Sequence, residues 1–131
     1  MADRFYDRGA VGNAKPAKEQ ASTVRAAVRM AALAEGFTPI DAGNGYLAWA
    51  KNGGRRTHVM FTCNGALDGD PDAAEWVAGR YGEKGGFLEV SGLTFAKAIE
   101  ATKILPVPLN NDGSLAESVY PSLEQAMSDM S

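Results

Sequence analysis

The stretch Tyr46–Cys63, YLAWAKNGGRRTHVMFTC, decides the fold that this sequence predicts. It holds two extended runs, Tyr46–Lys51 and Arg55–Cys63, separated by Asn52-Gly53-Gly54. Asn-Gly between extended runs is a strong signal for a β-hairpin. Alternate side chains of the second run share one face, which we expect to be core: Thr57, Val59, Phe61 and Cys63.

The other face of this hairpin is the candidate binding site. With a two-residue turn, Lys51 pairs with Arg56 and Trp49 with His58, or the register lies two residues away, so these four side chains share a face. Together with Arg55, they place an aromatic ring among cations, which suits a nucleic-acid base and its phosphate. The same patch suits an acidic protein partner. In the remaining alternative, helices cover this face and Trp49 is core.

Upstream of the hairpin, Lys18–Glu35 predicts a helix because it is rich in Ala, lacks internal Gly and Pro, and is followed by Gly36. Its apolar residues form two adjacent stripes, so we expect a wide face packed on a sheet. The stripes are Val24, Val28, Ala31 and Ala34, and Ala26, Met30, Leu33 and Phe37. Phe37–Asp41 contains Pro39 and predicts a short edge strand.

Downstream of the hairpin, Asp70–Glu75 has an Asp cap, Pro71 at the first helical position and further acids, which together predict a helix start. We expect that helix to end near Gly82. Phe87–Ser91 predicts a fourth strand, and Ser91 or Thr94 then caps a third helix.

The third helix is expected to reach Leu105, before Pro106 and Pro108. In the tail, Ser114–Glu117 matches a capping box. Leu115, Val119 and Leu123 follow at helical spacing, so we expect a last helix that Pro121 interrupts.

These elements predict an α/β (α+β) fold with a small mixed or antiparallel sheet flanked by helices, in the order α-β-β-β-α-β-α plus a helical tail. We divide the 131 residues into a flexible arm (1–17), a compact domain (18–109) and a helical tail packed on it (110–131).

The element order resembles that of restriction-endonuclease-like nucleases, and its first five elements are similar to a double-stranded-RNA-binding domain. The nuclease resemblance implies acidic metal ligands on the second and third strands. Tyr46–Lys51 and Arg55–Val59 contain none. The RNA-binding resemblance implies lysines at the start of the second helix, where this chain has acids.

Charge divides unevenly along the chain, whose net charge is −3. Residues 1–63 hold nine Lys/Arg against five Asp/Glu, and residues 64–131 hold four against eleven. A basic stripe on the first helix comprises Lys18, Ser22, Arg25 and Arg29, and it suits phosphates or a solvated helix face. An acidic set comprises Asp68, Asp70, Asp72 and Glu75; it suits helix capping or a basic partner and does not match an EF-hand loop.

The chain has few residues of the types that catalysis or metal binding requires. His58 and Cys63 are the only residues of their types, and their spacing on one strand directs them to opposite faces. We therefore expect no metal or other cofactor and no disulfide. The polar N-terminus and the lack of a long apolar run predict a cytoplasmic protein without a membrane association.

The leading hypothesis is a small non-enzymatic binding protein that docks on a macromolecule, with a protein partner favoured, as a regulator or inhibitor. Phages and mobile elements carry such proteins. The alternative is a nucleic-acid binder that uses the hairpin face and the stripe on the first helix. The third is a divergent metal-dependent nuclease-like enzyme built from Asp41, Glu35 or the Asp68–Asp72 cluster. The oligomeric state is left open.

Overall fold

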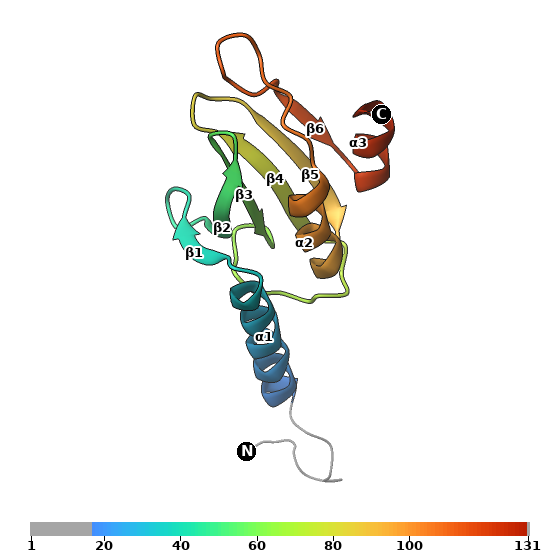
Figure 1. Cartoon of the computed structure of the whole chain (residues 1–131). Helices are drawn as coiled ribbons and strands as arrows, with labels where there is room; N and C mark the ends of the chain where they lie inside the picture. Colours follow the sequence, from blue (N-terminus) through green and yellow to red (C-terminus); the bar gives the residue numbers. More distant parts are fainter. Residues whose placement is uncertain (1–16, 131) are drawn as a thin grey trace, which may run out of the picture.

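The computed structural model describes residues 17–130 as an open six-stranded sheet with three helices (Figure 1). The elements are α1 (Ala17–Ala34), β1 (Thr38–Asp41), β2 (Leu47–Gly54), β3 (Thr57–Thr62), β4 (Trp76–Gly82), β5 (Phe87–Leu93), α2 (Phe95–Ile104), β6 (Ser118–Tyr120) and α3 (Leu123–Met130). The strands lie in sequence order, antiparallel except for β6, which runs parallel to β5. The predicted α+β class with a mixed sheet is confirmed.

One face of the sheet carries the hydrophobic core, and all three helices contribute to it. The ring of Phe61 is its centre, with ring centroids 4.8 Å from Phe37, 6.0 Å from Trp76 and 5.7 Å from Phe95. Trp49 and Trp76 are 1% and 0% exposed. Each of the large aromatic side chains buries roughly 150–250 Å², so these rings supply much of the stabilising burial. We call this side of the sheet the inner face.

The hairpin is present, but its predicted register is wrong. The turn falls at Arg55 and Arg56, whose φ angles are 52° and 60°, and not at the glycines before them. Trp49 is opposite Phe61, and the ladder shifts between Asn52 and Gly54 because Gly53 forms a bulge. A slip of one residue moves a side chain to the other face.

A buried side chain from β4 explains the bulge. Arg80 donates from Nη1 to the Gly53 carbonyl oxygen at 2.6 Å and to Thr57 Oγ1 at 2.9 Å. A Cβ at Gly53 would lie 2.6 Å from that same Nη1. The position therefore requires glycine, and the extra residue places its carbonyl where the guanidinium needs an acceptor.

The helix predicted from the Asp-Pro pattern is wrong, because residues 76–82 form β4. Trp76, Ala78 and Arg80 are buried on the inner face, an alternation of period two that overrides the helix signal. The Asp70 carboxylate accepts a bond from the Asp72 amide at 2.9 Å, so it stabilises a turn. A strand thus stands where both the nuclease and the RNA-binding resemblance require a helix, and neither resemblance holds.

Helix α1 begins and ends as predicted, within a residue, but its wide apolar face is wrong. Val28 and Ala32 are 2% and 0% exposed and belong to the core. Val24, Met30 and Leu33 are 39%, 69% and 56% exposed. The helix therefore packs by a narrow strip, and Figure 1 shows it extending from one end of the sheet.

The end of the chain is partly helical. The predicted third helix is confirmed as α2, and its cap Thr94 accepts from the Lys97 amide. The predicted capping box is wrong, since Leu115 is 1% exposed and bridges to Leu109. Val119 lies in β6, and the helix begins only at Leu123. Except for Ala17, the predicted arm of residues 1–17 lies outside the described residues.

Candidate functional site

The structure separates the residues of the predicted hairpin site. Trp49 is on the inner face, where its Nε1 donates to the Leu67 carbonyl oxygen at 2.6 Å. Lys51 shares that face, donates from Nζ to the Glu35 carbonyl oxygen at 2.8 Å and lies 4.5 Å from the centroid of the Phe37 ring. The shared Trp/Lys/Arg/His face is therefore a wrong prediction. Of the alternative, the core position of Trp49 is confirmed, whereas His58 stays exposed and is not covered by a helix.

The remaining basic residues lie at two ends of the molecule. Arg55 and Arg56 form the exposed turn before β3, and His58 is exposed just after it. Arg29 instead binds Asp68 at 3.0 Å, beyond the far end of β3. A strand of the length of β3 spans roughly 20 Å. The basic stripe on α1 and the tip of the hairpin therefore form no common surface. Arg25 is exposed on α1, and the side chain of Lys18 lies outside the described residues.

The acidic set forms a loop beside α1. Asp68 is engaged by Arg29 and Asp70 by its turn, while Asp72 and Glu75 are exposed. A groove of about 470 Å³ lies between this loop and Val24 and Arg25 on the helix. Within residues 17–130, no group of three His, Cys, Asp or Glu side chains is placed to hold a metal ion.

The carboxylates proposed for a nuclease-like site also have structural partners. Asp41 Oδ1 accepts from the Gly43 amide at 2.7 Å and supports the β1–β2 turn. Glu35 pairs with Lys103 at 3.0 Å and so joins the end of α1 to α2. Each acid serves a different part of the fold, and the structure brings neither of them to the acidic loop.

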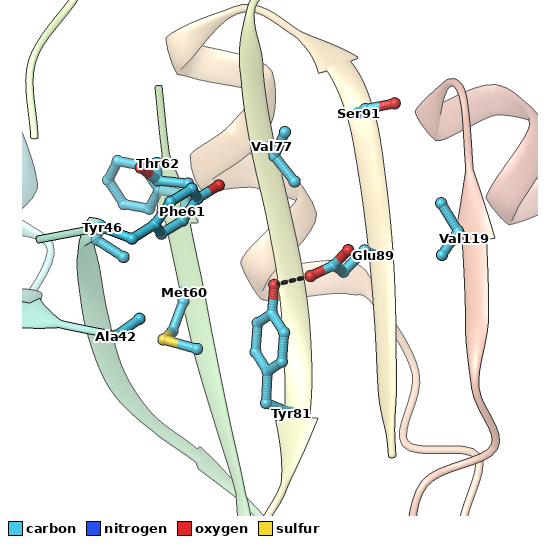
Figure 2. Close-up of a pocket in the computed structure, with 11 residues that line it drawn as sticks. Ala42, Tyr46, Met60, Phe61, Thr62, Val77, Tyr81, Glu89, Ser91 and Val119 are labelled. Carbon is cyan, nitrogen blue, oxygen red and sulfur yellow. Dashed lines mark hydrogen bonds between the residues drawn. The ribbon is translucent and has the colours of Figure 1, made fainter. Parts of the chain in front are cut away.

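A hollow lies on the face of the sheet opposite the core, and we call it the outer groove (Figure 2). It has a volume of about 330 Å³ and is lined by strands and their adjoining loops, with no helix residue among its lining. Its principal side chains are Tyr46, Met60, Val77, Tyr81, Glu89 and Val119. Small residues such as Ala48 and Ser91 form part of its floor.

Tyr81 and Glu89 form the polar centre of the outer groove. The Tyr81 hydroxyl donates to Glu89 Oε2 at 2.6 Å (Figure 2). Burial, and next the hydrogen bond and charge of Glu89, raise the pKa of Tyr81 well above its ordinary value. Tyr81 is therefore a neutral donor at every physiological pH, and it fixes one oxygen of the carboxylate.

Gly79 makes this arrangement possible. A Cβ at Gly79 would lie 2.9 Å from the Tyr81 hydroxyl oxygen and 3.1 Å from Tyr81 Cε2. The ring of Tyr81 therefore lies back along its own strand over the bare backbone of Gly79. Since Gly79 is directly opposite Glu89 in the ladder, this position of the ring brings the hydroxyl to the carboxylate.

The two ends of the outer groove are its most exposed parts. Tyr46 is 47% exposed and packs on Gly65, where a Cβ would lie 2.8 Å from the Tyr46 ring. Val119 on β6 is 65% exposed. The sequence patterns do not predict this site, because residues 70–82 were expected to form a helix and residues 114–120 a helical tail. The alternation of Val77, Gly79 and Tyr81 is the signal that would have found it.

The fold and the outer groove define an α+β domain with an open mixed sheet, helices on one face and a hollow on the other. Comparison with protein-family models, with curated proteins and with solved structures gave no match. None of the helices described between residues 17 and 130 is long and apolar enough to cross a membrane.

Proposed function

We propose that this protein is a non-enzymatic binding protein that docks on a protein partner, as a regulator or inhibitor, through the outer groove. The observation that carries the proposal is the groove itself, a hollow of about 330 Å³ on the face of the sheet opposite the helix-covered core. A sheet face with helices on one side only presents ordered backbone and side chains to another molecule at little cost in ordering.

The side chains of the outer groove support a protein partner. Tyr and Met are enriched at the centres of protein interfaces, and tyrosine combines a large apolar area with a polar group. Here Tyr46, Met60 and Tyr81 stand around a floor of small residues. Val119 adds an exposed aliphatic side chain at one end. Burial of such a surface is favourable, because a partner side chain displaces water from its apolar area.

Charge favours a protein over a nucleic acid at this groove. Its lining includes the carboxylate of Glu89 and no cation, so it repels a phosphate backbone. The basic residues proposed for nucleic acid lie elsewhere, and Arg29 is neutralised by Asp68. A nucleic-acid ligand is therefore an outcome of the test below and not the function that we propose.

Affinity capture with the full chain tests this function. Val77 faces the outer groove from β4, so Val77→Trp fills the hollow with an indole. Lys97→Trp is the matched control, because Lys97 is exposed on α2. We expect a stoichiometric protein from source lysate that survives nuclease treatment, that Lys97→Trp retains and that Val77→Trp loses, with thermal unfolding showing both variants folded.

Two results would contradict the proposal. Recovery of nucleic acid alone, with all protein lost after nuclease treatment, would favour the nucleic-acid alternative. Equal capture of one protein by Val77→Trp and Lys97→Trp would show that docking does not use the outer groove.

A further inference from the structure

We infer that the outer groove binds a basic side chain of the partner, an arginine in preference to a lysine, with its guanidinium against Glu89 and its aliphatic stem over Met60 and Val77. This inference rests on the proposed function and adds the chemistry of the side chain that the partner inserts.

Charge complementarity carries the inference. Glu89 is the charged side chain among the residues that line the outer groove. It takes part in none of the ion pairs formed within the described chain. Its bonding partner there is the neutral hydroxyl of Tyr81. A half-buried carboxylate without a counter-ion lowers its free energy when a cation arrives, because attraction is stronger in a partly apolar site than in water.

The position of the carboxylate favours a directed contact. The Tyr81 hydroxyl holds Glu89 Oε2, and Glu89 Oε1 receives no hydrogen bond from the described residues. Each carboxylate oxygen has two acceptor sites, so Oε1 and the second site of Oε2 remain for a donor. A planar guanidinium with a fork of N–H groups matches that pair of sites.

The walls of the outer groove favour arginine over lysine. Met60, Val77 and the rings of Tyr46 and Tyr81 line the groove that contains the carboxylate. A guanidinium is more weakly hydrated than an ammonium and stacks on aromatic faces, so it loses less on entering such a site. The arginine stem of three methylene groups would cover the apolar wall.

Titration with short peptides tests the inference directly. The probes are acetyl-Gly-Arg-Gly-amide and its neutral analogue with citrulline in place of arginine, added to the full isotope-labelled chain and followed by amide chemical shifts. We expect saturable shifts at residues 77–81 and 88–91, with a dissociation constant of about 1 mM, equivalent to roughly −4 kcal/mol. The citrulline peptide should bind at least about tenfold more weakly.

Three variants locate the interaction. Glu89→Gln keeps an acceptor for Tyr81 but removes the charge, and it should weaken the arginine peptide at least about tenfold. Val119 is directly opposite Glu89 in the ladder. The guanidinium introduced by Val119→Arg should therefore pair with the Glu89 carboxylate and weaken peptide binding as much as Glu89→Gln does. The matched control is Glu83→Gln, on the exposed turn after β4, which should change nothing.

Two results with the native protein would overturn the inference: equal shifts with both peptides, or shifts that fall outside the groove. The absence of shifts at 20 mM peptide, about twenty times the expected dissociation constant, would also overturn it. So would undiminished binding of the arginine peptide by Glu89→Gln. Its failure is distinguishable from failure of the proposed function. If Val77→Trp loses the captured protein while Glu89→Gln retains it fully, the groove docks a partner but does not select a cation. If Val77→Trp also retains it, the docking proposal itself fails.

Discussion

Replacing Arg80 by methionine tests how this fold holds its bulge. Arg80 is 6% exposed, and no acidic side chain pairs with it within residues 17–130. Its guanidinium donates to the Gly53 carbonyl oxygen, to Thr57 Oγ1 and, from Nη2 at 3.0 Å, to the Leu105 carbonyl oxygen. Burial lowers its pKa, and its Nε has no hydrogen-bond partner. The residue thus ties the bulge to the end of α2.

Two large terms oppose each other in Arg80→Met. The three hydrogen bonds from a charged donor contribute about 1.5–3 kcal/mol each, or roughly 4.5–9 kcal/mol together. The effective cost of removing the guanidinium from water is several kcal/mol, and the variant no longer incurs it. The two carbonyl oxygens that lose their donor cost about 1–3 kcal/mol each, or about 2–6 kcal/mol together. The first two terms largely cancel, so this cost decides the sign, and partial relaxation around the methionine keeps it near its lower end. We expect Arg80→Met to lower the free energy of unfolding by about 2–3 kcal/mol.

Urea unfolding followed by the fluorescence of the two buried tryptophans measures this change. With an m value of about 1.5 kcal/mol/M, a loss of about 2.5 kcal/mol moves the midpoint down by roughly 1.7 M. Lys103→Met is the control, because its ion pair with Glu35 is half-exposed and should contribute less than about 1 kcal/mol. If Arg80→Met is as stable as the parent, or more stable, the carbonyl contacts do not outweigh the buried charge and the reasoning is refuted.

Three further predictions concern the outer groove and its surroundings. The pKa of Tyr81 is raised in the fold, so its ionisation in the unfolded chain should lower the free energy of unfolding from about pH 10 upward, by up to about 1.4 kcal/mol per pH unit. Tyr81→Phe should flatten this alkaline decline. An unchanged slope would contradict the raised pKa of Tyr81. Gly79→Ala should displace the Tyr81 ring and cost about 1–3 kcal/mol in thermal unfolding. Tyr81→Ala in the same chain should relieve only part of this loss, because the new Cβ would also lie 2.8 Å from the Leu88 carbonyl oxygen. Simple additivity of the two changes would disprove the contact between that Cβ and the Tyr81 ring. Burial, and next the charges of nearby acids led by Glu75, raise the pKa of the Cys63 thiol. A thiol reagent at pH 8 should therefore label the native protein at least about tenfold more slowly than the unfolded protein. Equal labelling rates would show that Cys63 is accessible in the fold.

The elements that the sequence predicts correctly are those determined by short-range sequence features. Helix α2 has its cap Thr94 and ends before Pro106, and both features act within a single turn of chain. The edge position of β1 follows from Pro39, which cannot donate to a neighbouring strand. In each case the residue that decides the structure lies inside the element or next to it.

The wrong predictions depend on contacts with residues outside the short patterns on which they rested. The Asp-Pro pattern at residues 70–72 is the same whether a helix or a turn follows, and the Trp76 indole decides by donating to the Asp70 carbonyl oxygen at 3.0 Å. The hairpin register depends on Arg80, 27 residues beyond Gly53. Neither contact can be inferred from the Asp-Pro pattern or from the Asn-Gly turn signal alone.

The outer groove was missed because the alternation of Val77, Gly79 and Tyr81 was interpreted as part of a helix, and its shape also depends on the bulge. Without the extra residue at Gly53, the side chains of β2 beyond the bulge would exchange faces relative to β3. Trp49 would then face outward beside Met60, and its indole would lie on the side of the sheet where Ala48 now lines the hollow. The buried guanidinium of Arg80 on one face therefore helps to determine the shape of the outer groove on the other.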